Sequence, residues 1–249
     1  GVAAALAPIE SRRTAAAERD ALARSLICLA VSEEDKLALE RLAPPAGCPV
    51  FVLPNCAGGE VVPGPPVERG RDGIGEAVCV ACFGWLPNER GARWFLSQVL
   101  PRLRGREMRS RIRFVGSGIA PALAEAIRVA GCVCDADVPD TLPYLHRARA
   151  AIVPLLEGGG TRLKIVEAWA AGVPVVSTPL GAHGLGCVDG VDVLLAADVS
   201  AFADALHRVL EDDALYSRLR ESGLRRAEAL RWTRLAPVLE GLYASRLRD

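Results

Sequence analysis

The sequence is short of lysine and of long apolar runs, and it carries no excess of either charge. Its 249 residues include 30 basic and 30 acidic side chains, and only two of the basic ones are lysines, Lys36 and Lys164. Zero net charge argues against nucleic acid as the main partner, because a phosphate backbone calls for a basic excess. No apolar stretch approaches the roughly 18 residues that cross a bilayer. With 51% hydrophobic residues, the chain can bury a core, which excludes disorder.

The start of the sequence carries no recognisable export signal. The first residue is Gly1, the only methionine is Met108, and residues 1–8 have neither the basic nor the apolar part of a signal peptide. We therefore expect an N-terminally truncated polypeptide that works in the cytoplasm. Any contact with a membrane would be peripheral.

Eight cysteines raise the alternatives of disulfides and of a zinc site. A long, core-rich chain without an export signal favours reduced thiols. Cys79 and Cys82 form a C-x-x-C pair, and Cys132 and Cys134 follow about fifty residues later. The first pair lies in an apolar run typical of a buried strand, and the C-x-C spacing of the second departs from that of zinc ligands. We predict no metal site and no resident cofactor.

The pattern of apolar segments predicts an α/β protein in four parts. These are residues 1–56, a Gly- and Pro-rich linker at 57–76, a Rossmann-like domain at 77–231 and a C-terminal helix at 232–249. In the first part, Ser32 is expected to cap a helix that ends near Leu42. From 77 onwards, strands alternate with helices, which indicates an open parallel sheet covered by helices on both faces. The main predicted helices are 88–103, 120–130, 140–149, 161–171, 200–210 and 214–229.

The segment from Pro154 to Thr178 is the most informative stretch. It follows the order strand, glycine loop, helix, strand, with Gly158, Gly159 and Gly160 in the loop. Backbone N–H groups of Gly159 to Thr161, near a helix start, suit an anion such as a diphosphate. Arg162 and Lys164 add positive charge there.

Glu167 follows on a related face of the same helix, where a carboxylate could accept the two hydroxyls of a ribose. The alternative is a plain glycine turn beside a surface Glu–Lys pair. The Walker pattern is absent, and Gly116-Ser117-Gly118 is only part of a dinucleotide fingerprint. We expect His183 to be solvated and Trp169 and Trp232 to pack.

Residues 158–178, followed by Leu180 to Leu185, resemble the donor-binding signature of retaining glycosyltransferases of family 4. Other stretches resemble landmarks of that family in the same order: Val31 to Glu33 with Leu53 to Asn55, Phe83-Gly84 with Asn88, Phe114 to Gly118, and Val138 to Asp140. The resemblance implies a GT-B architecture, in which two Rossmann-like domains close over a nucleotide sugar. This chain would then be the donor-binding domain with the tail of the acceptor domain.

The resemblance also implies roles for individual residues. Glu167 is similar to the second Glu of the family's E-x7-E pair, which binds the ribose, whereas Gly159 stands where the first Glu would be. The loop from Cys134 to Val138 is placed like the nucleobase loop, and Gly84 precedes Trp85 where many members have Arg. The predicted donor-binding residues are Gly84, Val138, Gly159, Gly160, Thr161, Arg162, Lys164 and Glu167, with Arg162 and Lys164 as the catalytic pair.

The function implied is transfer of a sugar from a nucleotide-diphosphate sugar to an acceptor with retention, as in polysaccharide biosynthesis. The acceptor, a glycan or a lipid-linked glycan, would be held by a further domain, so the chain alone is expected to bind without turnover. Two alternatives remain at this point. One is a non-catalytic nucleotide-sugar binding module, and the other is a GT-B sugar-nucleotide epimerase.

Overall fold

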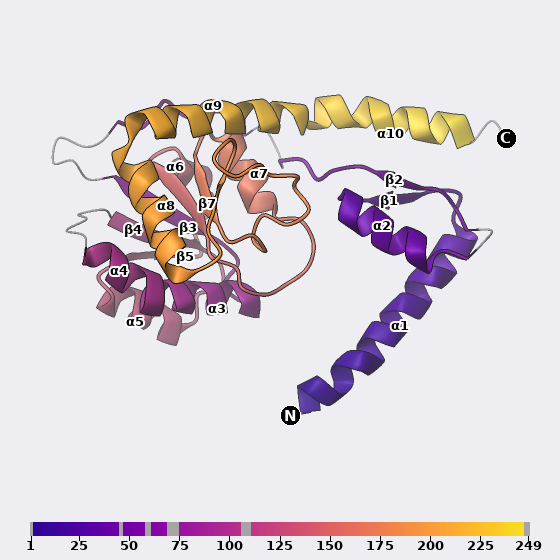
Figure 1. Cartoon of the computed structure of the whole chain (residues 1–249), viewed down its shortest axis with the longest axis horizontal. Coiled ribbons are helices and arrows are strands. Elements are labelled where there is room, and N and C mark those ends of the chain that lie inside the picture. The colour runs from indigo at the N-terminus through magenta and orange to yellow at the C-terminus, as the bar shows by residue number, and fades with distance from the viewer. Residues whose placement is uncertain (1, 45–46, 58–60, 69–74, 106–110, 247–249) are drawn as a thin grey trace. The chain divides into compact units, whose positions relative to one another are not determined.

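The structure is a computed structural model that describes residues 2–44, 47–57, 61–68, 75–105 and 111–246. Its contacts divide the chain into two compact units. The smaller unit contains residues 1–55 and 232–249, and the larger contains 56–231. Figure 1 shows the elements of both.

The smaller unit is built on two short parallel strands. Strands β1 (Cys28–Ala30) and β2 (Val50–Val52) pair, and helices α1 (Val2–Arg24), α2 (Glu33–Leu42) and α10 (Trp232–Arg246) belong to the same unit. The predicted cap of α2 is confirmed, since the Ser32 hydroxyl accepts from the Asp35 amide at 3.0 Å. Leu22, Ala30 and Val50 form its small core. The prediction that Trp232 packs is wrong, because its side chain is exposed.

The larger unit confirms the predicted parallel sheet. Its six strands are β3 (Glu76–Val80), β4 (Arg111–Gly116), β5 (Val133–Ala136), β6 (Ala150–Val153), β7 (Val175–Ser177) and β8 (Leu194–Leu195). They lie in the order β5-β4-β3-β6-β7-β8, and every neighbouring pair is parallel. This is the doubly wound order in which the chain first builds one half of the sheet outward from β3 and then the other half from β6.

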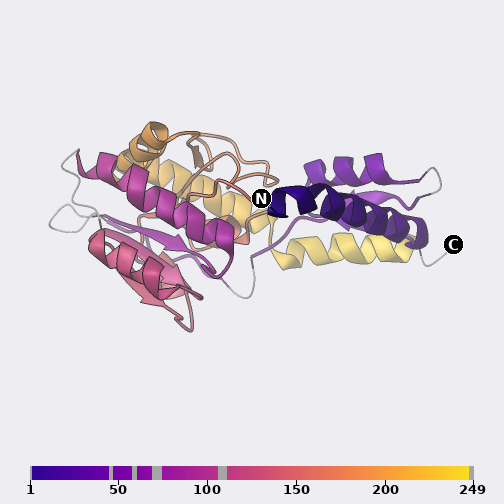
Figure 2. The same ribbon diagram turned by 90° about the horizontal axis from the view of Figure 1, so that it is seen from below.

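Helices cover both faces, as the buried runs in the strands require. One face packs against α3 (Leu86–Trp94), a π-helical turn η1 (Phe95–Val99), α4 (Leu100–Arg104), α5 (Pro121–Val129) and α8 (Val199–Glu211). The other packs against α6 (Leu142–Leu145), α7 (Leu163–Ala170) and the end of α9 (Asp213–Ala229). Figure 2 shows the first layer from below, with the magenta α3–α4 helix beside the pink α5.

Two predicted helices are shorter in the structure for reasons that the contacts show. The helix predicted at 140–149 is the single turn α6, because the Arg149 amide has left the helix to donate to the Glu76 carbonyl at the start of β3. The helix predicted from Thr161 begins at Leu163, because Gly160 has a positive φ of 78° and Arg162 is extended. Its end matches the prediction closely, with Gly172 at φ 76° and the bonds of a Schellman motif from Gly172 and Val173.

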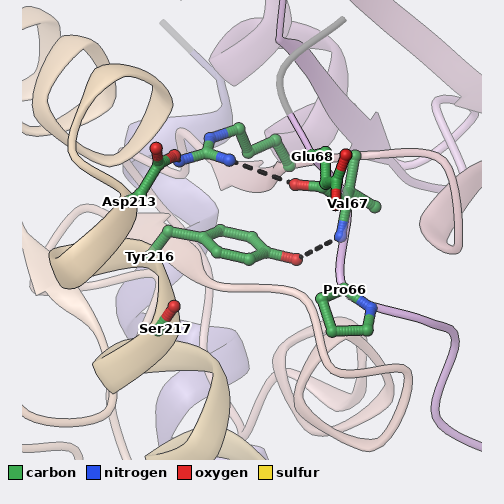
Figure 3. Close-up of a pocket in the computed structure, with 7 residues that line it drawn as sticks. Pro66, Val67, Glu68, Asp213, Tyr216 and Ser217 are labelled. Carbon is green, nitrogen blue, oxygen red and sulfur yellow. Dashed lines mark hydrogen bonds and ion pairs between the residues drawn. The ribbon is translucent and has the colours of Figure 1, made fainter.

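The predicted linker at 57–76 is partly held by the larger unit. Residues 58–60 and 69–74 lie outside the described residues. Between them, the Gly64 amide donates to Ala171 at 3.1 Å, and the Val67 amide donates to the Tyr216 hydroxyl at 2.9 Å. Figure 3 shows this second contact. The described segment 61–68 therefore lies along α9 as part of the larger unit, and Glu76 already belongs to β3.

Candidate nucleotide site

A cavity of about 310 Å³ opens where β3 and β4 end and α7 begins. The chain leaves the sheet in opposite directions from β3 and from β6, so the crevice beside their carboxyl ends is the place where ligands bind in such folds. The cavity is lined by residues of β3 and the loop after it, of the β4 end, of the loop before α6 and of α7: Val80, Ala81, Cys82, Gly116, Ser117, Val138, Thr141, Lys164 and Glu167.

The wall of the cavity depends on glycines that let two loops touch. Gly116 has a φ of 144°, and a Cβ there would collide with the Ala81 carbonyl oxygen and lie 2.9 Å from its carbon. A Cβ on Gly118 would lie 2.7 Å from the Gly84 nitrogen. The Phe83 amide donates to the Ser117 carbonyl at 2.8 Å across this contact. Gly84 thus contacts Gly118 within the wall and is not among the residues that line the cavity.

The loop after β5 is bound to the same wall. The Asp137 amide donates to the Gly116 carbonyl at 2.8 Å, and the Gly118 amide donates to the Asp137 carboxylate at 3.1 Å. Asp137 adopts a positive φ of 51°, which is uncommon for a residue with a side chain. This turn brings Val138 to the cavity, where the sequence had placed a nucleobase loop.

Helix α7 presents a cation and a carboxylate to the cavity one turn apart. Lys164 and Glu167 both line it, and the Lys164 Nζ donates to the Asn88 Oδ1 at 2.7 Å. Burial lowers the pKa of Lys164, and burial raises the pKa of Glu167, an effect that Lys164 opposes. Both groups have therefore lost water that an anion and a pair of hydroxyls could replace.

Arg162 lies beside the cavity and is turned toward the glycine loop. Its guanidinium donates to the Gly159 carbonyl and, at 2.9 Å, to the Gly160 carbonyl, and it stacks over the Trp85 ring with 5.5 Å to the centroid. The side chain is buried, and its Nε has no partner among the described residues. Burial lowers its pKa. In this structure Arg162 fixes the shape of the loop.

The structure brings together some of the predicted site residues and leaves others at the margin. Val138, Lys164 and Glu167 line the cavity, whereas Gly159, Gly160, Thr161 and Arg162 form the loop beside it and are not among its described lining residues. Glu157 is bound outside the cavity by Arg90, with two contacts of 2.7 and 2.9 Å. His183 is exposed as expected, and Trp169 is fully buried as expected.

Sequence reasoning missed six of the nine residues that line the cavity: Val80, Ala81, Cys82, Gly116, Ser117 and Thr141. They lie at or just after the ends of β3 and β4, or directly before α6. The only signal that the sequence offers for them is that ligands bind at the carboxyl ends of parallel strands. All eight cysteines are free. Burial raises the pKa of Cys79 to about 11, whereas a hydrogen bond from Ser117 lowers the pKa of Cys82. Across the described residues, no three metal-binding side chains converge.

A second cavity, of about 470 Å³, lies between segment 61–68 and α9 (Figure 3). Three of its polar residues already serve the fold. Arg149 donates to the Val67 carbonyl at 3.1 Å, pairs with the Asp213 carboxylate and stacks on Tyr216 at 4.4 Å. These contacts hold segment 61–68 in place.

The fold is that of a Rossmann-like domain, and its first cavity lies at the carboxyl ends of β3 and β4. Within the described residues, no helix has the length and apolar character needed to cross a membrane. The chain belongs to the family described as glycosyl transferases group 1, whose model matches residues 77–212. That range contains every residue that lines the first cavity.

Known proteins of this kind resemble the chain over part of their length. A D-inositol 3-phosphate glycosyltransferase of Corynebacterium aurimucosum is 34% identical over 108 residues, which are 43% of this chain and 26% of that protein. A sucrose-phosphate synthase structure from Thermosynechococcus elongatus covers 94% of this chain and 61% of its own, with a TM-score of 0.72 and 20% identity.

A third match is a pneumococcal O-GlcNAc transferase, GtfA, solved in complex with UDP and GlcNAc. It has a TM-score of 0.67 and 11% identity, and the match covers 90% of this chain and 46% of that one. At these identities the solved structures establish the shared fold. The chain spans about a quarter of the length of the D-inositol 3-phosphate glycosyltransferase.

Proposed function

We propose that this chain is the donor-binding part of a retaining glycosyltransferase that uses a nucleotide-diphosphate sugar. The observation that carries the proposal is the pair Lys164 and Glu167, which line one cavity at the carboxyl ends of β3 and β4. Membership of the glycosyl transferases group 1 family supports it. So does the likeness in fold to a transferase that was solved with UDP.

Each part of a nucleotide diphosphate has a complementary group in the cavity. The base would lie against Val138 and the loop after β5, and the ribose hydroxyls would donate to the Glu167 carboxylate. The diphosphate would lie against the Lys164 ammonium, about 4.5 Å nearer the start of α7 at 1.5 Å per residue. A point charge of this kind suits phosphate oxygens.

The chemistry would be stabilisation of the leaving group. As the bond from sugar to diphosphate breaks, negative charge grows on the departing oxygens. The Lys164 ammonium would neutralise that charge, and Arg162 would fix the shape of the glycine loop beside the cavity. Loss of one such donor typically costs on the order of 10²–10³ in rate. Glu167 would orient the nucleotide.

The acceptor side of the reaction belongs to the same proposal. A glycan or lipid-linked acceptor would be gripped by a further domain, with at most peripheral contact to a membrane, and the enzyme would work in the cytoplasm. The chain by itself would bind the nucleotide without turnover. Because the Lys164 ammonium supplies positive charge for the diphosphate, the scheme requires no resident cofactor.

Calorimetric titration with UDP, GDP and ADP tests the site. We expect at least one of them to bind, and we expect Lys164→Met and Glu167→Gln each to weaken that binding about tenfold or more, as for a lost hydrogen bond to a charged group. The matched controls are Lys36→Met, the other lysine, and Glu157→Gln, whose carboxylate is held by Arg90. Unchanged affinity in both site variants would refute the assignment.

One observation favours a second function, that of a non-catalytic nucleotide-sugar binding module. Gly159 occupies the place of the first Glu of the family's pair, and the nearby Glu157 is tied to Arg90 outside the cavity. Transfer assays with radiolabelled nucleotide sugars separate the two. Sugar transferred to an acceptor by a form that carries the acceptor domain supports the enzyme, and binding without transfer in that form supports the module.

A further inference from the structure

Asn88 joins the two sides of the crevice through one side chain. It is the third residue of α3, and only 8% of its surface is exposed. Its Nδ2 donates to the Cys82 carbonyl at 2.7 Å, and its Oδ1 accepts from the Lys164 Nζ at 2.7 Å. An ammonium can only donate and a carbonyl can only accept, so these partners fix which way the amide points.

The Cys82 carbonyl is itself held by the turn after β3. It also accepts the Trp85 amide at 3.3 Å, and the Asn88 amide donates to the Trp85 carbonyl at 2.9 Å. Asn88 is therefore anchored to the turn after β3, and its hydrogen bond holds the long, flexible Lys164 side chain of α7 in one position. Without the anchor, the lysine would have to give up rotamer freedom when an anion binds.

The anchor is neutral, which matters for the charge of the cavity. An amide oxygen holds an ammonium without cancelling its charge, whereas a carboxylate would compete with an incoming anion. Four ionisable groups act on Lys164: Cys79 at the end of β3, Cys82 after it, Arg162 directly before α7 and Glu167 within α7. Cys79 is neutral at pH 7, because burial raises its pKa to about 11.

We propose that Asn88 is a positioning residue that aims the Lys164 ammonium at the diphosphate in the cavity. This inference rests on the proposed function, because it presumes that a nucleotide diphosphate is the ligand. It gives Asn88, which the sequence marked only as a landmark of the family, a specific part in donor binding. Asn88 itself need not touch the nucleotide.

The first test compares the pH dependence of nucleotide affinity in Asn88→Ala and Asn88→Asp, using whichever of UDP, GDP or ADP binds the wild type. We expect affinity to fall about tenfold in each at pH 7, as for a lost hydrogen bond to a charged group. Binding needs the protonated ammonium, so affinity declines as pH rises through the pKa of Lys164. Removing an acceptor lowers that pKa, and adding a carboxylate raises it.

The two variants should therefore move the midpoint of the pH profile in opposite directions, down for Asn88→Ala and up for Asn88→Asp. A merely structural role would leave the midpoint in place, so an unmoved midpoint overturns the proposal. Circular dichroism verifies folding. If Asn88→Ala does not fold, Asn88→Asp, which keeps the size of the side chain, decides the question by the direction of its shift.

A double-variant cycle is the second test. If Asn88 acts through Lys164, then Asn88→Ala should change affinity less than twofold in a Lys164→Met background. An equal loss in both backgrounds overturns the proposal. The proposed function and the role of Asn88 are refuted by different results. A wild type that binds none of the nucleotides refutes the proposed function, whereas binding that depends on Lys164 but not on Asn88 refutes only the role of Asn88.

Discussion

Replacement of Gly116 by alanine should break the wall of the candidate nucleotide site and destabilise the larger unit. Gly116 ends β4 with a φ of 144°, a conformation that side-chain-bearing residues rarely adopt. The added Cβ would overlap the Ala81 carbonyl oxygen. It would also lie 2.9 Å from the Ala81 carbonyl carbon and 3.3 Å from the Ala81 backbone nitrogen. These are backbone atoms, so no side chain can swing aside to make room.

The expected cost follows from those contacts. Backbone strain of this kind costs about 1–3 kcal/mol. Separating the strand ends would also weaken the hydrogen bonds from the Ala81 amide to Val115, at 3.1 Å, and from the Phe83 amide to Ser117, at 2.8 Å. At about 1 kcal/mol for each bond, we expect the free energy of unfolding to fall by about 3–5 kcal/mol, a large share of the roughly 5–15 kcal/mol of a typical domain.

Urea denaturation followed by tryptophan fluorescence measures this loss, because Trp169 is fully buried in the larger unit. The control is Gly190→Ala, which also has a positive φ, 73°, but has nothing within 4 Å of the added Cβ. That control should lose only about 1–2 kcal/mol. If the free energy of unfolding fell equally in the two variants, the contact with Ala81 would contribute nothing to stability, and the reasoning would be refuted.

Two further predictions concern the loop and the segment beside the sheet. Arg162→Lys should weaken nucleotide binding in calorimetry about tenfold. The reason is that a single ammonium cannot replace a guanidinium that holds two loop carbonyls and stacks on Trp85. Undiminished affinity would contradict the role of Arg162 in shaping the loop for binding. Tyr216→Phe should lower the free energy of unfolding by about 1 kcal/mol, because the Val67 amide loses its acceptor. A thermal melt equal to that of the wild type would mean that this hydrogen bond adds nothing to stability.

Much of the fold could be predicted because its signals are local. Apolar runs of strand length separated by helical patterns predicted the parallel sheet, and Ser32 predicted a helix start. One error arose where a distant partner decided the outcome. Helix α6 is one turn long because the Arg149 amide pairs with Glu76, a residue more than seventy positions earlier.

The candidate site divides in the same way. Lys164 and Glu167 could be placed together from their spacing on one helix, and Val138 from its place after a strand. The predicted role of Arg162 and of the Gly159 to Thr161 amides in grasping the ligand remains a prediction. The structure shows Arg162 bound to its own loop, because the extended conformation before Leu163 turns its guanidinium back.

The sequence by itself determined the strand and helix order, the glycine positions and the face of α7 that carries charge, because these follow from periodicity and backbone freedom over a few residues. Only the tertiary structure decided that Asn88, Cys82 and Lys164 meet across the crevice. Sheet order places β3 beside β6, so α3 and α7, which follow these strands, approach each other. The Lys164 Nζ therefore lies 2.7 Å from the Asn88 Oδ1, although the two residues are 76 positions apart in the sequence. No local pattern encodes that distance.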